Sequence, residues 1–157
     1  MKIRLICVGK TERSYLKEGE SEYLKRLKHY CSFEKIEISE LKNAKKLSED
    51  QIKAEEGKLI LAKVEPSEQL ILLDENGKSF NSVSFSKFLQ KKFNQGGKSI
   101  VFVVGGAYGF SDELYTRSNG KISLSEMTFS HQMVRLFFIE QVYRALTILK
   151  GEPYHHQ

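Results

Sequence analysis

The residues in this chain that point most directly to chemistry are three glycines that follow a short apolar run. In "VFVVGGAYGF", residues 101–110, Gly105, Gly106 and Gly109 come directly after Val104. Because glycine lacks a Cβ atom, its backbone adopts positive φ readily and allows a ligand to approach the main chain closely. The stretch therefore predicts either a tight turn or a ligand site at the carboxyl end of a strand.

The spacing of these glycines differs from two common nucleotide-binding motifs. The dinucleotide fingerprint has G-x-G-x-x-G after the first strand, whereas this chain has G-G-x-x-G after a late strand. A P-loop requires Gly-Lys-Ser/Thr, and no such triplet follows here. An adenine-nucleotide-dependent enzyme such as an oxidoreductase remains an alternative, which binding of NAD would favour.

Two other segments end predicted strands, "LDENG" at 73–77 and "LSEMTF" at 124–129. In a parallel α/β sheet the loops that follow the strands meet at one edge, where ligands bind. These loops offer glycine backbone, few fixed charges and apolar walls from Leu73, Leu124, Met127 and Phe129. The combination suits a flat heteroaromatic ring such as adenine, held by main-chain hydrogen bonds, better than it suits a polyphosphate.

The elements that position these loops alternate along the chain. Hydrophobic periodicity predicts strands at 3–8, 33–39, 69–74, 99–104 and 121–125, and helices at 14–30, 48–64, 82–97, 111–118 and 130–151. Such alternation predicts a single α/β domain over residues 1–157, with a mainly parallel sheet and helices on both faces.

The last predicted helix is apolar around its whole circumference, which a surface helix is not. One sheet face of so small a domain cannot cover it. Two explanations remain open, a subunit interface in a two-fold homodimer or burial within one chain, and we favour the dimer.

Composition narrows the class of protein further. The chain has 157 residues, a formal net charge of +5 and two cysteines, Cys7 and Cys31. The positive charge favours an anionic partner, nucleic acid first, although many enzymes are moderately basic. The cysteines lack metal-ligand spacing, and no apolar run approaches the roughly 18 residues of a membrane helix. We expect a cytoplasmic protein that binds neither metal nor membrane.

Five motifs, in order and spacing, identify a resemblance that covers the whole chain. They are "MKIRLICVGK", "LLDENGK", "VFVVGGAYGF", "LSEMTFSHQMVRLFFIEQVYRA" and "GEPYHH". With these motifs the chain resembles the RlmH family of ribosomal RNA methyltransferases, within the SPOUT superfamily. The resemblance implies a SPOUT-type α/β fold with a C-terminal trefoil knot, which general topology rules would disfavour, and a homodimer.

The resemblance also implies a methyl donor and an acceptor. The donor is S-adenosylmethionine, bound by the three knot loops. The acceptor is N3 of a pseudouridine in 23S ribosomal RNA, methylated on the assembled ribosome. The residues that we expect to contact the cofactor on this basis are Leu73, Gly105, Leu124, Ser125, Glu126, Met127, Thr128 and Phe129.

Methylation of a ring nitrogen requires loss of its proton, so the site needs a base or a group that stabilises the deprotonated ring. The tail "YHH" supplies the candidates, with Tyr154 stacking on or hydrogen-bonding the ring and His155 accepting the proton. The alternative is a frayed polar tail.

Arg135, Arg144 and His156 are candidate contacts to RNA. Glu140 and Arg144 are four residues apart, so an ion pair on the helix surface is an equally good interpretation of that arginine. Two positions depart from the family pattern. Ser130 precedes His131 where relatives usually have proline, and His156 replaces a usual Arg or Lys. A final alternative is a non-catalytic ribosome-binding protein that keeps the fold.

Overall fold

The computed structural model describes residues 1–156, and five parallel strands form its single sheet, in the order β2-β1-β4-β3-β5. The strands are β1 (Lys2–Val8), β2 (Ser32–Ile38), β3 (Gln69–Ser79), β4 (Ile100–Val104) and β5 (Gly120–Ser123). The helices are α1 (Ser14–Leu27), α2 (Glu49–Leu61), α3 (Ser82–Asn94), α4 (Asp112–Arg117) and α5 (Met133–Leu149), with a short 3-10 turn η1 (Ala44–Lys46). The predicted parallel α/β fold is confirmed.

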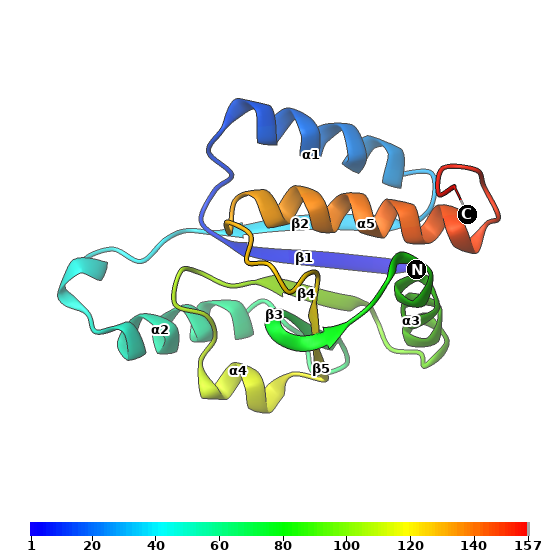
Figure 1. Cartoon of the computed structure of the whole chain (residues 1–157). Coiled ribbons are helices and arrows are strands. Elements are labelled where there is room, and N and C mark those ends of the chain that lie inside the picture. The colour runs from blue at the N-terminus through cyan, green and yellow to red at the C-terminus, as the bar shows by residue number, and fades with distance from the viewer. Residues whose placement is uncertain (157) are drawn as a thin grey trace.

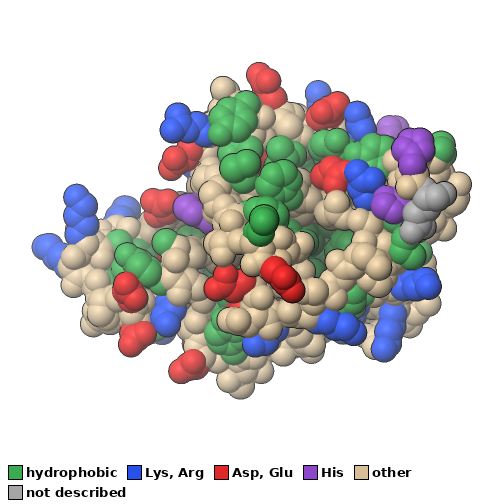
Figure 2. All heavy atoms as spheres, in the orientation of Figure 1, with side chains coloured by type: hydrophobic (Ala, Val, Ile, Leu, Met, Phe, Trp, Pro, Cys, Tyr) green, Lys and Arg blue, Asp and Glu red, His purple; other side chains and the backbone are tan. Residues whose placement is uncertain are grey.

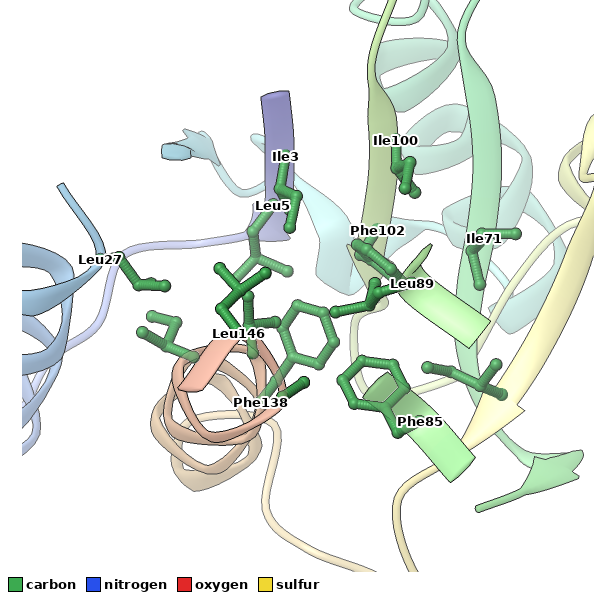
Figure 3. Packing of buried hydrophobic residues seen from close by; sticks show 14 of the residues in the cluster. Ile3, Leu5, Leu27, Ile71, Phe85, Leu89, Ile100, Phe102, Phe138 and Leu146 are labelled. Atoms are coloured by element: carbon green, nitrogen blue, oxygen red, sulfur yellow. The ribbon is translucent and has the colours of Figure 1, made fainter. Parts of the chain in front are cut away.

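Helices cover both faces of the sheet, as expected. In Figure 1, α1, α5 and α3 lie on one side of the strands, and α2 and α4 lie on the other. Each side has its own apolar core. Phe138 and Leu146 of α5 and Phe85 of α3 point towards Phe102 of the central strand β4 (Figure 3). The ring centroids of Phe102 and Phe138 are 4.7 Å apart.

Local sequence signals explain where the helices begin. Ser48 and Gln51 form the predicted capping box of α2, in which the Ser48 hydroxyl accepts from the Gln51 amide and the Gln51 side chain accepts from the Ser48 amide. Ser111 caps α4, also as predicted. The helix expected from 130 begins at Met133, and the Ser130 hydroxyl accepts a hydrogen bond from the Met133 amide. Ser130 thus satisfies an amide at the start of the helix.

The sequence-based boundary of β3 was wrong. The strand was expected to stop at Asp74, but it continues to Ser79, with a register shift against β5 between Leu73 and Lys78. At Gly77 the chain lies so close to β5 that an added Cβ atom would be 2.6 Å from the backbone nitrogen of Ile122. Because Asn and Gly are typical turn residues, the sequence "ENGK" concealed the continuation of β3 beside β5.

A buried carboxylate stabilises the edge of the sheet at which the strands begin. Glu68 is 4% exposed, binds Arg4 at 2.7 Å and accepts from the Glu65 amide and the Ser99 hydroxyl. Burial alone would raise the pKa of Glu68, but the hydrogen bonds from Ser99, Glu65 and Arg4 outweigh it, so the pKa lies below its ordinary value.

Glu68→Gln is therefore expected to lower the free energy of unfolding at pH 7 by about 1.5–3 kcal/mol, the range for hydrogen bonds to a charged group. A carboxyl whose pKa is depressed on folding stabilises the protein above its unfolded pKa, and this contribution is lost as pH falls through the folded pKa. The difference between variant and wild type should shrink in urea titrations at decreasing pH. The control is Glu65→Gln, which removes the exposed Lys98–Glu65 pair and should cost at most about 1 kcal/mol. An equal loss in both variants would contradict this assignment.

Candidate active site

The carboxyl ends of β3, β4 and β5 surround a cavity of about 730 Å³. Its walls include most of the residues that the resemblance assigned to the cofactor, namely Leu73, Gly105, Leu124, Ser125, Met127, Thr128 and Phe129. Glu126 is exposed and does not line the cavity. The three predicted loops therefore do meet at one site, as the rule for parallel sheets requires.

The glycine loop forms one wall of this cavity. Gly109 has a φ of 86°, in the region that favours glycine, and its amide donates to the Gly106 carbonyl at 3.2 Å. A Cβ atom on Gly105 would lie 2.9 Å from the ring of Phe110, and one on Gly106 would lie 2.7 Å from a carboxylate oxygen of Glu56. The two interpretations of the glycine run are compatible, because the turn at Gly109 lies in the cavity wall, and glycine at 105 and 106 leaves room for Phe110 and Glu56 to pack behind that wall.

Two acidic side chains that follow the buried half of β3, Asp74 and Glu75, accept hydrogen bonds from other segments around the cavity. Tyr115 donates a hydrogen bond to Asp74, and Thr128 donates to Glu75 at 3.1 Å. Burial, followed by the Asp74 hydrogen bond, raises the pKa of Tyr115 to about 12, so this phenol stays protonated. Asp74 also accepts from the Asn76 amide at 2.8 Å. Both carboxylates are held by neighbours that fix the cavity's rim.

Arg135 does not lie on the surface, so its predicted contact with RNA is corrected. Its side chain is completely buried at the start of α5 and donates to the carbonyl oxygens of Val8, Gly9 and His131 at 2.8, 2.9 and 3.0 Å. The Thr11 hydroxyl accepts a further bond at 3.2 Å. The sequence concealed this role because the helix that carries Arg135 is apolar on every side. Arg135 joins the end of β1 to His131, which lines the cavity.

Arg135→Met is expected to lower the free energy of unfolding by about 3–5 kcal/mol, because it leaves buried polar groups without their partner. At roughly 2–4 °C per kcal/mol for a chain of this size, Tm should fall by at least about 6 °C. Arg144→Met, the same change on the same helix, removes a partly exposed ion pair and should cost no more than about 1 kcal/mol. Thermal denaturation of the two variants tests this prediction, and equal Tm values would refute the structural role of Arg135.

The C-terminal tail is ordered rather than frayed. The Tyr154 hydroxyl donates to Glu140 at 2.8 Å and accepts from Tyr23 at 3.2 Å, and its ring packs edge-on against Tyr143. Burial, then the bonds to Tyr23 and Glu140, raise the pKa of Tyr154 above its ordinary range. The phenol therefore stays protonated and is already occupied by protein partners, which favours a positioning role over direct contact with a base.

Arg144 holds the adjacent histidine. Its guanidinium pairs with Glu140 at 2.7 Å, as the spacing indicated, and another nitrogen of the guanidinium lies 3.1 Å from Nδ1 of His155. Because arginine only donates, Nδ1 accepts, and the proton of the neutral imidazole is on Nε2. Sequence reasoning missed Glu140 and Tyr23 as tail partners, since no spacing rule links residues so far apart.

Within one chain the tail and the cavity are far apart. Val134 lines the cavity, whereas Arg144 lies ten residues further along α5, which corresponds to about 15 Å along the helix axis. Figure 1 shows the end of α5 and the tail that follows it at the edge of the sheet where β1 begins, opposite the carboxyl ends of the strands. Tyr154, His155 and the half-buried Arg144 are thus brought together with one another and not with the cofactor residues. His156 is exposed beside them.

An exposed apolar patch adjoins the cavity. It consists of Tyr15, Met127, Phe129, Met133 and Phe137, each 37–78% exposed. Figure 2 shows hydrophobic side chains gathered over the N-terminal ends of α1 and α5. The expected apolar surface of the last helix therefore remains partly open in one chain.

Within residues 1–156, no three His, Cys, Asp or Glu side chains are placed to hold a metal ion. No helix in that range is both long enough and apolar enough to cross a membrane.

The parallel sheet and the glycine-lined cavity agree with the comparison with protein families, in which residues 1–155 match the model described as "Predicted SPOUT methyltransferase". The chain belongs to the SPOUT methyltransferase family. It is 61% identical to a protein of Flavobacterium psychrophilum and 59% identical to one of Flavobacterium johnsoniae, over the full length of each pair. A protein of Porphyromonas gingivalis is 52% identical over the same extent. All three relatives bear the name "Ribosomal RNA large subunit methyltransferase H".

Proposed function

We propose that this chain is an S-adenosylmethionine-dependent methyltransferase that modifies N3 of a pseudouridine in 23S ribosomal RNA, on the assembled ribosome in the cytoplasm. The observation that carries the proposal is the cavity, which three loops form at the carboxyl edge of the sheet in a SPOUT methyltransferase. The full-length similarity to proteins named for large-subunit ribosomal RNA supports the choice of RNA.

The residues present fit an adenosine-containing cofactor. A volume of about 730 Å³ lies within the usual range for small-molecule sites. Leu73 and Leu124 offer apolar walls for a purine ring, and Gly105 and Gly106 line the cavity, where their main chain can form hydrogen bonds with a ligand. When bound, S-adenosylmethionine supplies a methyl group activated by its positively charged sulfur.

The tail's hydrogen bonds indicate how the chain assists the acceptor base. Arg144 occupies Nδ1 of His155, so the neutral ring presents an N–H at Nε2 rather than a free lone pair. In this arrangement the N3 proton of pseudouridine passes to water, and His155 stabilises the resulting anion by donating a hydrogen bond. Acting as the proton acceptor, which was the first hypothesis, would require His155 to leave Arg144. Tyr154 positions the histidine through Glu140, which in turn pairs with Arg144, and Tyr23 holds the Tyr154 hydroxyl from the other side.

A homodimer would bring the tail of one chain to the cavity of the other. Covering the patch of Tyr15, Met127, Phe129, Met133 and Phe137 with a second copy would bury its apolar surface. If the two α5 helices cross antiparallel at a two-fold axis, the C-terminal end of each lies beside the N-terminal end of the other. Each tail would then reach its partner's cavity, and the site would be complete only in the dimer.

The direct test is transfer of a radiolabelled methyl group from S-adenosylmethionine. The acceptors are assembled ribosomes and free large subunits, both from a strain lacking the modification. Label in large-subunit RNA, obtained only with assembled ribosomes, is the expected result. Ribosome binding with no label on either acceptor would instead favour the non-catalytic binding protein, and NAD binding without S-adenosylmethionine binding would favour a nucleotide-dependent enzyme.

A further inference from the structure

The positive charge of the chain is concentrated in one segment. Between Glu75 and Asp112 there is no acidic residue, and this segment contains five lysines, Lys78, Lys87, Lys91, Lys92 and Lys98. Their charge equals the formal net charge of +5 for the whole protein, so basic and acidic residues balance over the rest of the chain. A concentrated positive field of this kind attracts polyanions.

The segment includes α3, which presents its lysines at an open groove. The groove has a volume of about 430 Å³ and lies between α3 and the last turn of α5. Its lining residues are Lys87, Gln90, Lys91, Asn94, Gln95 and Leu149. Lys87 and Lys91 are exposed, one turn apart, and neither forms an ion pair with any residue in the range 1–156. Ammonium and amide groups without a carboxylate are suited to phosphate oxygens.

The lysines of α1 lie in a different electrostatic setting. A second groove on α1 includes Lys17, Lys25 and Arg26, but Glu18 and Glu22 line it too. Arg26 pairs with Glu22 at 3.0 Å. These carboxylates neutralise the cations and would repel a phosphate, so α1 is the weaker candidate for RNA although it carries as many cationic residues as α3.

We propose that the groove between α3 and the end of α5 binds the phosphodiester backbone of the RNA substrate, an inference that rests on the proposed function. Leu149 lines the groove and is the last residue of α5. The tail that holds His155 follows it directly. Figure 2 shows basic side chains over α3 and histidines over the neighbouring tail on the same side of the molecule. An RNA strand in the groove is therefore guided to the group that assists methylation.

The test variant is Lys87→Gln/Lys91→Gln, and its matched control is Lys17→Gln/Lys25→Gln on α1. Binding to protein-free large-subunit ribosomal RNA and to intact ribosomes is measured by filter binding over a series of salt concentrations. Each lysine that contacts phosphate contributes about 1 to the slope of log affinity against log salt. We expect the α3 variant to lose about 2 from that slope and the α1 control to lose much less. S-adenosylmethionine affinity and Tm should be unchanged in both.

Equal slopes for the α3 variant and wild type would overturn the inference, as would an equal loss in the α1 control. Binding lost on ribosomes but retained on protein-free RNA would also overturn it, since the groove would then contact a protein. The wild-type methyl-transfer assay separates this inference from the proposed function. Wild type that binds RNA through the groove and transfers no methyl group would refute the enzyme and leave the groove assigned.

Discussion

Mixed dimers of an Ala107→Trp chain and a His155→Ala chain should transfer methyl groups at about half the wild-type rate per dimer, although each homodimer is nearly inactive. Ala107 is exposed and lines the cavity, so a tryptophan there fills cofactor space without disturbing the core. Loss of His155 should cost on the order of 10²–10³ in rate, the usual effect of removing one hydrogen-bond donor that stabilises negative charge in the transition state. If sites are shared, one site of the mixed dimer combines an open cavity with an intact tail, and the other carries both defects.

The experiment requires dimers proven to be mixed, for example by purification through two different affinity tags. Each homodimer is assayed alongside as its own control, and the circular dichroism spectra should match wild type. Mixed dimers no more active than the homodimers would show that each chain uses its own tail. Since about 15 Å of α5 separates Arg144 from the cavity, that result would require the tail to leave its partners on α1 and α5.

Gly77→Ala should prevent folding or lower the free energy of unfolding by more than about 3 kcal/mol, a magnitude typical of an overpacked site that cannot relax. The added Cβ atom would lie 2.6–2.7 Å from the backbone N, Cα and C atoms of Ile122. The atoms in the way belong to backbone, so no side-chain rotation relieves the overlap. The chain would have to separate β3 from β5, two paired strands whose carboxyl ends both line the cavity. The yield of soluble protein and urea denaturation measure the effect.

Gly120→Ala is the matched control, because it changes the same residue type on the adjoining strand. A Cβ atom there would meet only the Ile71 side chain, at 3.7 Å, which is ordinary van der Waals contact. This variant should keep its stability to within about 1 kcal/mol, since alanine also reduces the entropy of the unfolded chain. Wild-type stability in the Gly77 variant would show that β3 and β5 approach less closely than described.

The strands and helices could be predicted from the sequence because each follows a strong local pattern. The buried strand β4 is continuously apolar, and serines cap α2 and α4 at the expected positions. The second half of β3 could not be predicted, because "ENGK" has the composition of a turn and its pairing with β5 is a tertiary interaction. The trefoil knot implied by the resemblance remains a prediction.

The sequence predicted the cavity better than it predicted the surroundings of Arg135 and the position of the C-terminal tail. The cavity loops follow from the rule for parallel sheets, and the structure brings them together. Arg135 misled the sequence analysis because an arginine on a predicted helix is usually exposed, whereas here three backbone carbonyls bind it inside the protein. The distance of the tail from the cavity depends on how α5 crosses the sheet, which periodicity does not reveal.

The bond from Arg135 to Val8 also constrains how the protein is synthesised, because it joins residues 127 positions apart. β1 is among the first elements to emerge during translation, yet the carbonyls at its carboxyl end obtain their buried donor only when the last helix has been made. The end of β1 must therefore wait for almost the entire chain before its buried contacts are complete, and contacts of such long range slow folding. A nascent chain that stalls before α5 would expose the core face that Phe138 covers, and it would be a substrate for chaperones or proteases rather than a partly active enzyme.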